Sequence, residues 1–177
     1  GSGFEKFDNV ELVEEFNIDT PFGKPSSGLK KVAVDGHEAL FLSRHGKFHE
    51  KLPSEVNYRA NIFALKKLGA QQILSVSAVG SLAEECKPGD MVVPNQYFDR
   101  TKSIREHTFC GDGVVGHMSL AHPVCSYWTE ALVEMASSLD FDIHFGGTYV
   151  CIEGPNFSTL AESCLLYTSP SPRDKHR

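Results

Sequence analysis

The sequence predicts an α/β fold in which helices flank a mixed central β-sheet. Residues 73–79 (ILSVSAV) form a short apolar run that ends at Gly80, as in a strand buried on both faces. Ahead of this run, apolar side chains in residues 55–68 recur at helical spacing, and Gly69 follows as a natural C-cap. A helix that leads into a buried strand is typical of a βαβ crossover, so we expect parallel neighbours in the sheet.

The remaining elements follow from turn residues and periodicity. Residues 31–34 and 38–42 are expected to form a hairpin around Asp35-Gly36. Short strands are expected at 91–94, 141–145 and 148–152, with residues 96–101 after the first of them and Asp99-Arg100 as a local ion pair or a turn. Residues 104–118 are a long Gly-rich loop. Residues 127–139 form an amphipathic helix whose core face we expect to consist of Trp128, Leu132, Met135 and Leu139.

Composition excludes several classes of function. The 177 residues are enough for one domain, and the net charge of −6 offers no basic surface for nucleic acid or anionic lipid. No apolar run approaches membrane-spanning length, and the first residues lack the pattern of a signal peptide. The five cysteines are irregularly spaced and without a CxxC pair, which favours free thiols in a reducing cytoplasm. The three histidines between 37 and 49 lack a carboxylate at ligand spacing, so we expect no metal site.

Two stretches are candidates for an anion site. Ligands of parallel sheets bind beyond the carboxyl ends of the strands, which directs attention to residues 77–81 (SAVGS). Small residues let a ligand approach the backbone there, and hydroxyl and amide groups suit an anion. Arg44 and His45 follow the strand 38–42 and precede Gly46, an arrangement that suits an anion clamp. On composition alone, a solvated loop explains Arg44 and His45 better.

Other candidates have simpler structural alternatives. Phe157 lies just beyond the strand 148–152, where its ring could stack on a flat ligand, although a core phenylalanine is the alternative. His117 ends the long loop and could equally be a surface or hydrogen-bonded histidine. Gly1-Ser2-Gly3 is too short a pattern to identify a phosphate loop.

Eight segments taken together carry a specific resemblance. In order and in content they resemble the trimeric purine nucleoside phosphorylase family, and within it the branch that acts on 5′-methylthioadenosine. The resemblance covers residues 1 to about 163. The segments are 1–4 (GSGF), 19–25 (DTPFGKP), 41–46 (FLSRHG), 53–65 (PSEVNYRANIFAL), 75–82 (SVSAVGSL), 88–90 (PGD), 96–101 (QYFDRT) and 152–158 (IEGPNFS).

The resemblance implies a reaction and a set of site residues. The family catalyses phosphorolysis, in which inorganic phosphate attacks the anomeric carbon of a purine nucleoside and releases the purine and a sugar 1-phosphate. We therefore expect phosphate as co-substrate, no cofactor, no metal and a cytoplasmic homotrimer that serves purine and methionine salvage. The implied phosphate-binding residues are Ser2, Arg44, His45 and Ser77. The implied nucleoside-binding residues are Ala78, Phe157 and His117, the last donated across the trimer interface.

Both ends depart from the family pattern. The first strand of the family would precede Gly1, and its last third would follow residue 163. That third holds the acidic pair that assists protonation of the purine, so we expect no catalytic acid in this chain, and no turnover by it. Residues 1–163 are thus expected to be a partial phosphorylase domain. Residues 164–177 (CLLYTSPSPRDKHR) have the look of a translated sequencing adapter, with a genuine disordered tail as the alternative.

Three other functions stay open. Methylthioinosine, or inosine and guanosine, could replace methylthioadenosine as substrate, because the choice between 6-amino and 6-oxo purines depends on the acidic segment. A protein that only binds phosphate or nucleoside without turnover, or that serves as a structural subunit, is a second alternative. A nicotinamide-dependent dehydrogenase is the third, but the complete glycine fingerprint that it requires is missing.

Overall fold

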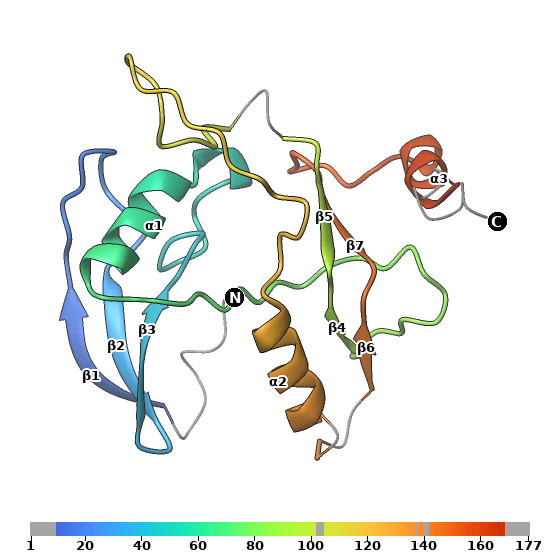
Figure 1. Cartoon of the computed structure of the whole chain (residues 1–177), viewed down its shortest axis with the longest axis horizontal. Helices are drawn as coiled ribbons and strands as arrows, with labels where there is room; N and C mark the ends of the chain where they lie inside the picture. Colours follow the sequence, from blue (N-terminus) through green and yellow to red (C-terminus); the bar gives the residue numbers. More distant parts are fainter. Residues whose placement is uncertain (1–9, 102–104, 137, 140–141, 169–177) are drawn as a thin grey trace. The chain divides into compact units, whose positions relative to one another are not determined.

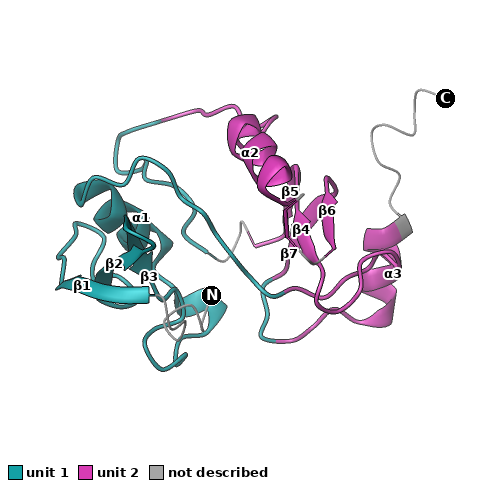
Figure 2. Ribbon diagram, turned by 90° about the horizontal axis from the view of Figure 1, so that it is seen from below, with its two compact units in different colours: residues 1–78, 102–115, 153–155 teal, residues 79–101, 116–152, 156–177 magenta. Residues whose placement is uncertain are grey.

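The computed structural model describes residues 10–101, 105–136, 138–139 and 142–168. The chain divides into two compact units (Figure 2). Unit 1 comprises residues 1–78, 102–115 and 153–155, and unit 2 comprises residues 79–101, 116–152 and 156–177. Each unit is described separately below.

Unit 1 contains a three-stranded antiparallel sheet in the order β1-β2-β3, made of β1 Val10–Phe16, β2 Leu29–Val34 and β3 His37–Leu42. The predicted hairpin is confirmed: β2 pairs with β3, and Asp35 and Gly36 have φ of 47° and 80°, as a tight two-residue turn requires. β1 was not predicted. It pairs with β2 through an irregularity between Leu12 and Glu14.

Helix α1, Tyr58–Lys67, confirms the helix predicted at 55–68, although residues 53–55 form a short 3-10 helix, η2 Pro53–Glu55, before it. The Asn57 side chain caps α1 by accepting a hydrogen bond from the Ala60 amide at 3.0 Å. The helix lies beside the three-stranded sheet in both views (Figures 1 and 2). Its buried positions are Ala60, Asn61 and Ala64, whereas Ile62, one of the apolar residues of the predicted helix 55–68, is 41% exposed.

The strand predicted at residues 73–79 is not formed. These residues have no regular secondary structure, and Ile73, Leu74 and Val79 are 56%, 69% and 57% exposed. A strand requires hydrogen-bonded neighbours, and none of the strands in the described part of the chain pairs with this run. The apolar composition was therefore read correctly, but the conclusion that it builds a buried strand was wrong.

Unit 2 contains two parallel strand pairs, so parallel pairing is present, but the run 73–79 from which it was expected takes no part in it. Strand β4 Met91–Val93 pairs with β6 Ile143–Phe145, and β5 Gln96–Asp99 pairs with β7 Thr148–Cys151. The pairs follow one another along the chain, so they form one interrupted ribbon (Figure 1). At the interruption Gly146 and Gly147 have φ of 94° and 90°, and the Asn95 amide donates to the Gly147 carbonyl at 3.2 Å.

Two local predictions in unit 2 can be compared with the structure. Asp99 Oδ1 accepts hydrogen bonds from the amide and the hydroxyl of Thr101, at 2.8 and 2.7 Å, which agrees with the turn, one of the two alternatives predicted for Asp99-Arg100. Helix α2, Ser126–Ala136, is confirmed, but it has no buried residue among those described. On its expected core face Trp128 is 37% and Met135 is 62% exposed.

Helix α3, Leu160–Thr168, crosses the predicted boundary between residues 163 and 164. It begins with a capping box in which the Thr159 amide donates to Glu162 Oε2 at 2.8 Å and the Glu162 amide donates to Thr159 Oγ1 at 3.2 Å. Residues 164–168 are thus helical, and residues 169–177, the rest of the segment interpreted as an adapter or a disordered tail, lie outside the described part. Among the described helices none is long and apolar enough to cross a membrane.

Candidate functional site

Three polar side chains converge in unit 1. Arg44 and His45 follow the end of β3, and Ser77 comes from the irregular segment after α1. Arg44 Nη1 donates to Ser77 Oγ at 3.4 Å, and Arg44 Nε donates to His45 Nε2 at 3.3 Å. The three side chains are half-buried, so a small anion can reach them while solvent screens their charge only in part. We call these three residues the cradle.

Backbone geometry fixes the loop that carries Arg44 and His45. Gly46 has φ of 88°, a conformation that suits glycine, and its amide closes a turn onto the Ser43 carbonyl at 3.0 Å. The Lys51 amide donates back to the His45 carbonyl at 2.9 Å. The His49 ring stacks on the His45 ring with centroids 4.7 Å apart. Backbone hydrogen bonds thus fix the loop that carries His45, and the stacked His49 ring restrains its imidazole.

The contacts of His45 also define its tautomer. Nδ1 lies 3.0 Å from the carbonyl oxygen of Lys51. A carbonyl oxygen can only accept a hydrogen bond, so Nδ1 carries the hydrogen and donates it. Nε2 is then the acceptor of the hydrogen bond from Arg44.

A carboxylate borders the cradle loop without entering it. Hydrogen bonds from the backbone amides of Glu50 itself and of Phe48 hold the pKa of Glu50 below its ordinary range. Glu50 is therefore ionised at neutral pH and is already engaged by its own loop, with Oε2 2.8 Å from the Phe48 amide. The cationic and hydroxyl groups of the cradle remain available to an oxyanion.

The other predicted site residues are distributed differently. Ser2 lies outside the described residues. Ala78, directly after Ser77, is exposed. His117 and Phe157 belong to unit 2, where His117 is exposed and Phe157 is 92% exposed. The alternative that Phe157 is a core residue is therefore wrong within the described structure, and its ring is open to a ligand.

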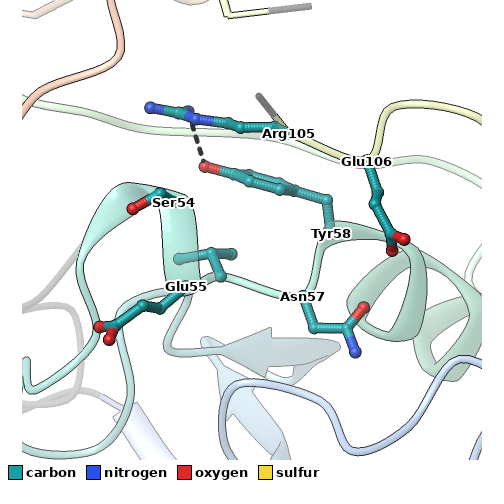
Figure 3. Close-up of a pocket in the computed structure, with 7 residues that line it drawn as sticks. Ser54, Glu55, Asn57, Tyr58, Arg105 and Glu106 are labelled. Carbon is teal, nitrogen blue, oxygen red and sulfur yellow. Dashed lines mark hydrogen bonds between the residues drawn. The ribbon is translucent and has the colours of Figure 1, made fainter. Parts of the chain in front are cut away.

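A second cluster, which the sequence did not indicate, surrounds Arg105. Its guanidinium donates to the Tyr58 hydroxyl at 3.0 Å, to Glu153 Oε1 at 3.1 Å and to the Glu153 carbonyl at 2.7 Å. The cluster borders a cavity of about 240 Å³, and Figure 3 shows Arg105 beside the Tyr58 ring with Glu106 pointing away from it. Ser54, Glu55, Val56, Asn57, Tyr58, Arg105 and Glu106 line this cavity. Their separation of up to 52 positions explains why no local pattern revealed the cluster.

We searched the described residues for side chains that could bind a metal ion together. Within the described ranges, no group of three or more histidine, cysteine, aspartate or glutamate side chains is arranged to hold a metal ion. His144 and Asp90, whose Nε2 and Oδ2 atoms lie 2.8 Å apart, instead join β6 to the residue before β4.

Comparison with known proteins gives a consistent picture. The family model described as "Phosphorylase superfamily" matches residues 2–170. Proteins named S-methyl-5′-thioadenosine phosphorylase are similar over most of the chain. The one from Geobacter sulfurreducens is 48% identical over 165 residues, which are 93% of this chain and 58% of the relative. The one from Hyperthermus butylicus is 47% identical over 163 residues, which are 92% of this chain and 59% of the relative.

Solved structures are similar as well. A methylthioadenosine phosphorylase from an Antarctic soil metagenomic library superposes with a TM-score of 0.88 at 46% identity, and the match covers 96% of this chain and 60% of the other. The methylthioadenosine phosphorylase of Schistosoma mansoni in complex with adenine gives 0.86 at 38% identity, with 95% and 68% covered. These matches confirm the predicted mixed α/β fold. The chain spans somewhat less than two thirds of the length of the curated relatives it matches.

Proposed function

The chain belongs to the phosphorylase superfamily, and on that premise we propose that the protein catalyses phosphorolysis of 5′-methylthioadenosine. A phosphate oxygen attacks the anomeric carbon, the bond from that carbon to the purine nitrogen breaks, and the purine leaves with the electron pair and takes up a proton. The products are adenine and 5-methylthioribose 1-phosphate. The names of the relatives support this substrate. The convergence of Arg44, His45 and Ser77 is the single observation that carries the proposal.

The cradle suits the electrostatics of this reaction. The bond from the sugar to the purine breaks before the bond from the sugar to phosphate has formed, so positive charge develops on the sugar. A phosphate dianion held next to that carbon stabilises the charge, provided that the protein fixes the dianion in place. Arg44 supplies a planar fork of donors, Ser77 a hydroxyl and His45 a fixed imidazole. Ser2 is proposed to add a second hydroxyl.

The nucleoside is proposed to contact Ala78, Phe157 and His117. The exposed ring of Phe157 is suited to stack on a purine, and the small side chain of Ala78 leaves room beside Ser77. His117 is proposed to cross the subunit interface of a homotrimer and to contact the 5′-substituent of the nucleoside that is bound to the neighbouring subunit. All five cysteines are free thiols, which supports a cytoplasmic enzyme.

Proton delivery to the purine requires an acid that we assign to none of the residues of this chain. We propose that it comes from the acidic pair that the family carries in its last third. Turnover is therefore tested in an extended chain, in which the C-terminal part of the Geobacter sulfurreducens relative follows residue 163. The 177-residue chain itself is tested for binding.

The binding experiment is a calorimetric titration of the 177-residue chain with inorganic phosphate. We expect saturable binding that Arg44→Met weakens at least about tenfold, since a hydrogen bond to a charged group contributes about 1.5–3 kcal/mol. Lys47→Met is the matched control, because Lys47 is an exposed cation of the same loop, and its ammonium group lies 5.7 Å from the centre of the Phe48 ring. Equal losses in the two variants would mean that net charge, and not the cradle, attracts phosphate.

The turnover experiment offers methylthioadenosine, methylthioinosine, inosine and guanosine to the extended chain, with and without phosphate. We expect phosphate-dependent release of adenine from methylthioadenosine to be fastest. Faster cleavage of a 6-oxo nucleoside would mean that this nucleoside, and not methylthioadenosine, is the preferred substrate. Phosphate binding without any turnover would mean that the protein binds phosphate but is not an enzyme.

A further inference from the structure

We propose that Arg105, acting through Glu153, is a positioning residue that fixes the chain entering Phe157 and so sets the affinity for the nucleoside. The inference rests on the proposed function, because it takes Phe157 as the ring that stacks on the purine. Neither Arg105 nor Glu153 is expected to touch phosphate or nucleoside.

The geometry of Arg105 fixes a backbone as well as a side chain. Its Nε donates to the Glu153 carboxylate at 3.1 Å and its Nη2 donates to the Glu153 carbonyl oxygen at 2.7 Å. Two bonds from one rigid guanidinium to one residue define both the position and the orientation of that peptide. The Arg105 side chain is only 10% exposed and that of Glu153 is 23% exposed, so water competes little for these bonds.

The anchor is itself attached to the first turn of α1. Arg105 Nη1 donates to the Tyr58 hydroxyl at 3.0 Å, and that hydroxyl donates to the Pro53 carbonyl at 3.2 Å. The guanidinium also lies 5.7 Å from the centre of the Tyr58 ring. Residue 153 is thus tied to a helix through a chain of hydrogen bonds within one compact unit.

Chain geometry connects this anchor to Phe157. Arg105 bonds to Glu153, and Phe157 follows Glu153 by four positions. Four residues of fully extended chain span at most about 14 Å between Cα atoms. The residue that carries the ring is therefore only four positions beyond a backbone that Arg105 holds, and loosening residue 153 loosens the start of that short connection.

The arrangement fits positioning better than stabilisation. Buried ion pairs are often no more stable than apolar residues of similar volume. Glu153 Oε2 is buried without a hydrogen-bond partner in the described structure, which makes this pair less favourable still. A pair that adds little stability but fixes a peptide next to a proposed ligand-binding ring is explained by the orientation that it imposes.

The test is a double-mutant cycle between Arg105→Lys and Phe157→Ala in the 177-residue chain, with calorimetric titrations of methylthioadenosine and of phosphate. Lysine keeps the positive charge but lacks the planar guanidinium that makes two hydrogen bonds to Glu153. We expect each single variant to weaken methylthioadenosine binding about tenfold, the affinity that one well-placed aromatic contact supplies. In the Phe157→Ala background, Arg105→Lys should cause no further loss, and phosphate affinity should stay within twofold throughout.

Glu106→Gln is the matched control. Glu106 is the neighbour of Arg105, lines the same cavity and pairs with Arg59, while its own side chain is exposed. It should leave both affinities unchanged. Additive losses in the cycle, an equal loss of phosphate affinity, or a tenfold loss in Glu106→Gln would each overturn the inference. So would a parent chain that binds phosphate but no methylthioadenosine, since no affinity would then depend on Phe157.

A second measurement does not depend on the proposed function. Hydrogen exchange of residues 153–157 should be faster in Arg105→Lys, and to a smaller extent in Tyr58→Phe, which removes one hydroxyl and is less disruptive. The exchange of β2 should not change. Unaltered exchange of residues 153–157 in both variants would refute the anchor even if the parent chain bound no phosphate, whereas failure to bind phosphate alone counts against the proposed function.

Discussion

Replacing Asn61 by alanine should destabilise unit 1 by about 2–4 kcal/mol. Asn61 is 5% exposed on α1, and its side chain makes two hydrogen bonds with Ser26, which is 7% exposed. The Ser26 amide donates to Asn61 Oδ1 at 2.7 Å, and Asn61 Nδ2 donates to Ser26 Oγ at 3.0 Å. Alanine leaves the Ser26 amide buried without a partner, at about 1–3 kcal/mol, and removes a second bond of about 1 kcal/mol.

The partner variant separates these two contributions. Ser26→Ala removes only the hydroxyl acceptor, so it should cost about 1–2 kcal/mol. The double variant should be about 1 kcal/mol more stable than the sum of the two single losses predicts, because the bond that Ser26→Ala removes is already absent in Asn61→Ala. Urea unfolding followed by circular dichroism gives the free energies, and hydrogen exchange of α1 assigns them to unit 1. A loss below about 0.5 kcal/mol in Asn61→Ala, or strict additivity, would refute the buried pair.

Three further predictions concern other parts of the chain. Hydrogen bonds from His144 and from the Lys87 amide hold the pKa of Asp90 below its ordinary value, so the stability that this carboxylate contributes is complete above about pH 4 and is lost as the pH falls further. Asp90→Asn should flatten that part of a pH–stability curve, and an unchanged curve would contradict the assignment. Gly46→Ala should weaken phosphate binding, as measured by calorimetry, because φ of 88° strains any residue with a Cβ; undiminished affinity would show that the loop adapts. Thr159→Ala removes the cap of α3 and should cost about 1 kcal/mol of helix stability, seen as faster hydrogen exchange in its first turns, whereas unchanged exchange there would argue against the cap.

Elements with local signals were predicted well from the sequence. The cap and periodicity of α1, the turn at Asp35-Gly36 and the strands β4, β6 and β7 all depend on residues that are near one another in the chain. β5 was not predicted as a strand. β1 was missed because its sequence, VELVEEF, carries three acidic residues and no clean alternation. It pairs because Glu14 and Glu15 lie opposite Lys31 and Lys30, a complementarity that appears only once the register is known.

Contacts between distant residues were the least predictable part. The run 73–79 has strand-like composition, but hydrogen-bonded neighbours decide whether a strand forms, and its composition does not specify them. Composition alone favoured a solvated loop for Arg44 and His45, and only the family resemblance joined them to Ser77, 33 positions away. The structure brings these side chains together, while the roles proposed for them stay predictions. Arg105 and Glu153 had no counterpart in any local pattern, since their partnership depends on a separation of 48 residues.

The orientation of one imidazole constrains how an oxyanion can enter the cradle. With Nδ1 of His45 committed to the Lys51 carbonyl, the nitrogen beside Arg44 presents a lone pair. An oxygen atom without hydrogen would be repelled there, so a hydrogen phosphate ion is expected to turn its own P–OH group toward this nitrogen. An oxyanion that carries no hydrogen, such as sulfate, would lack that hydrogen bond.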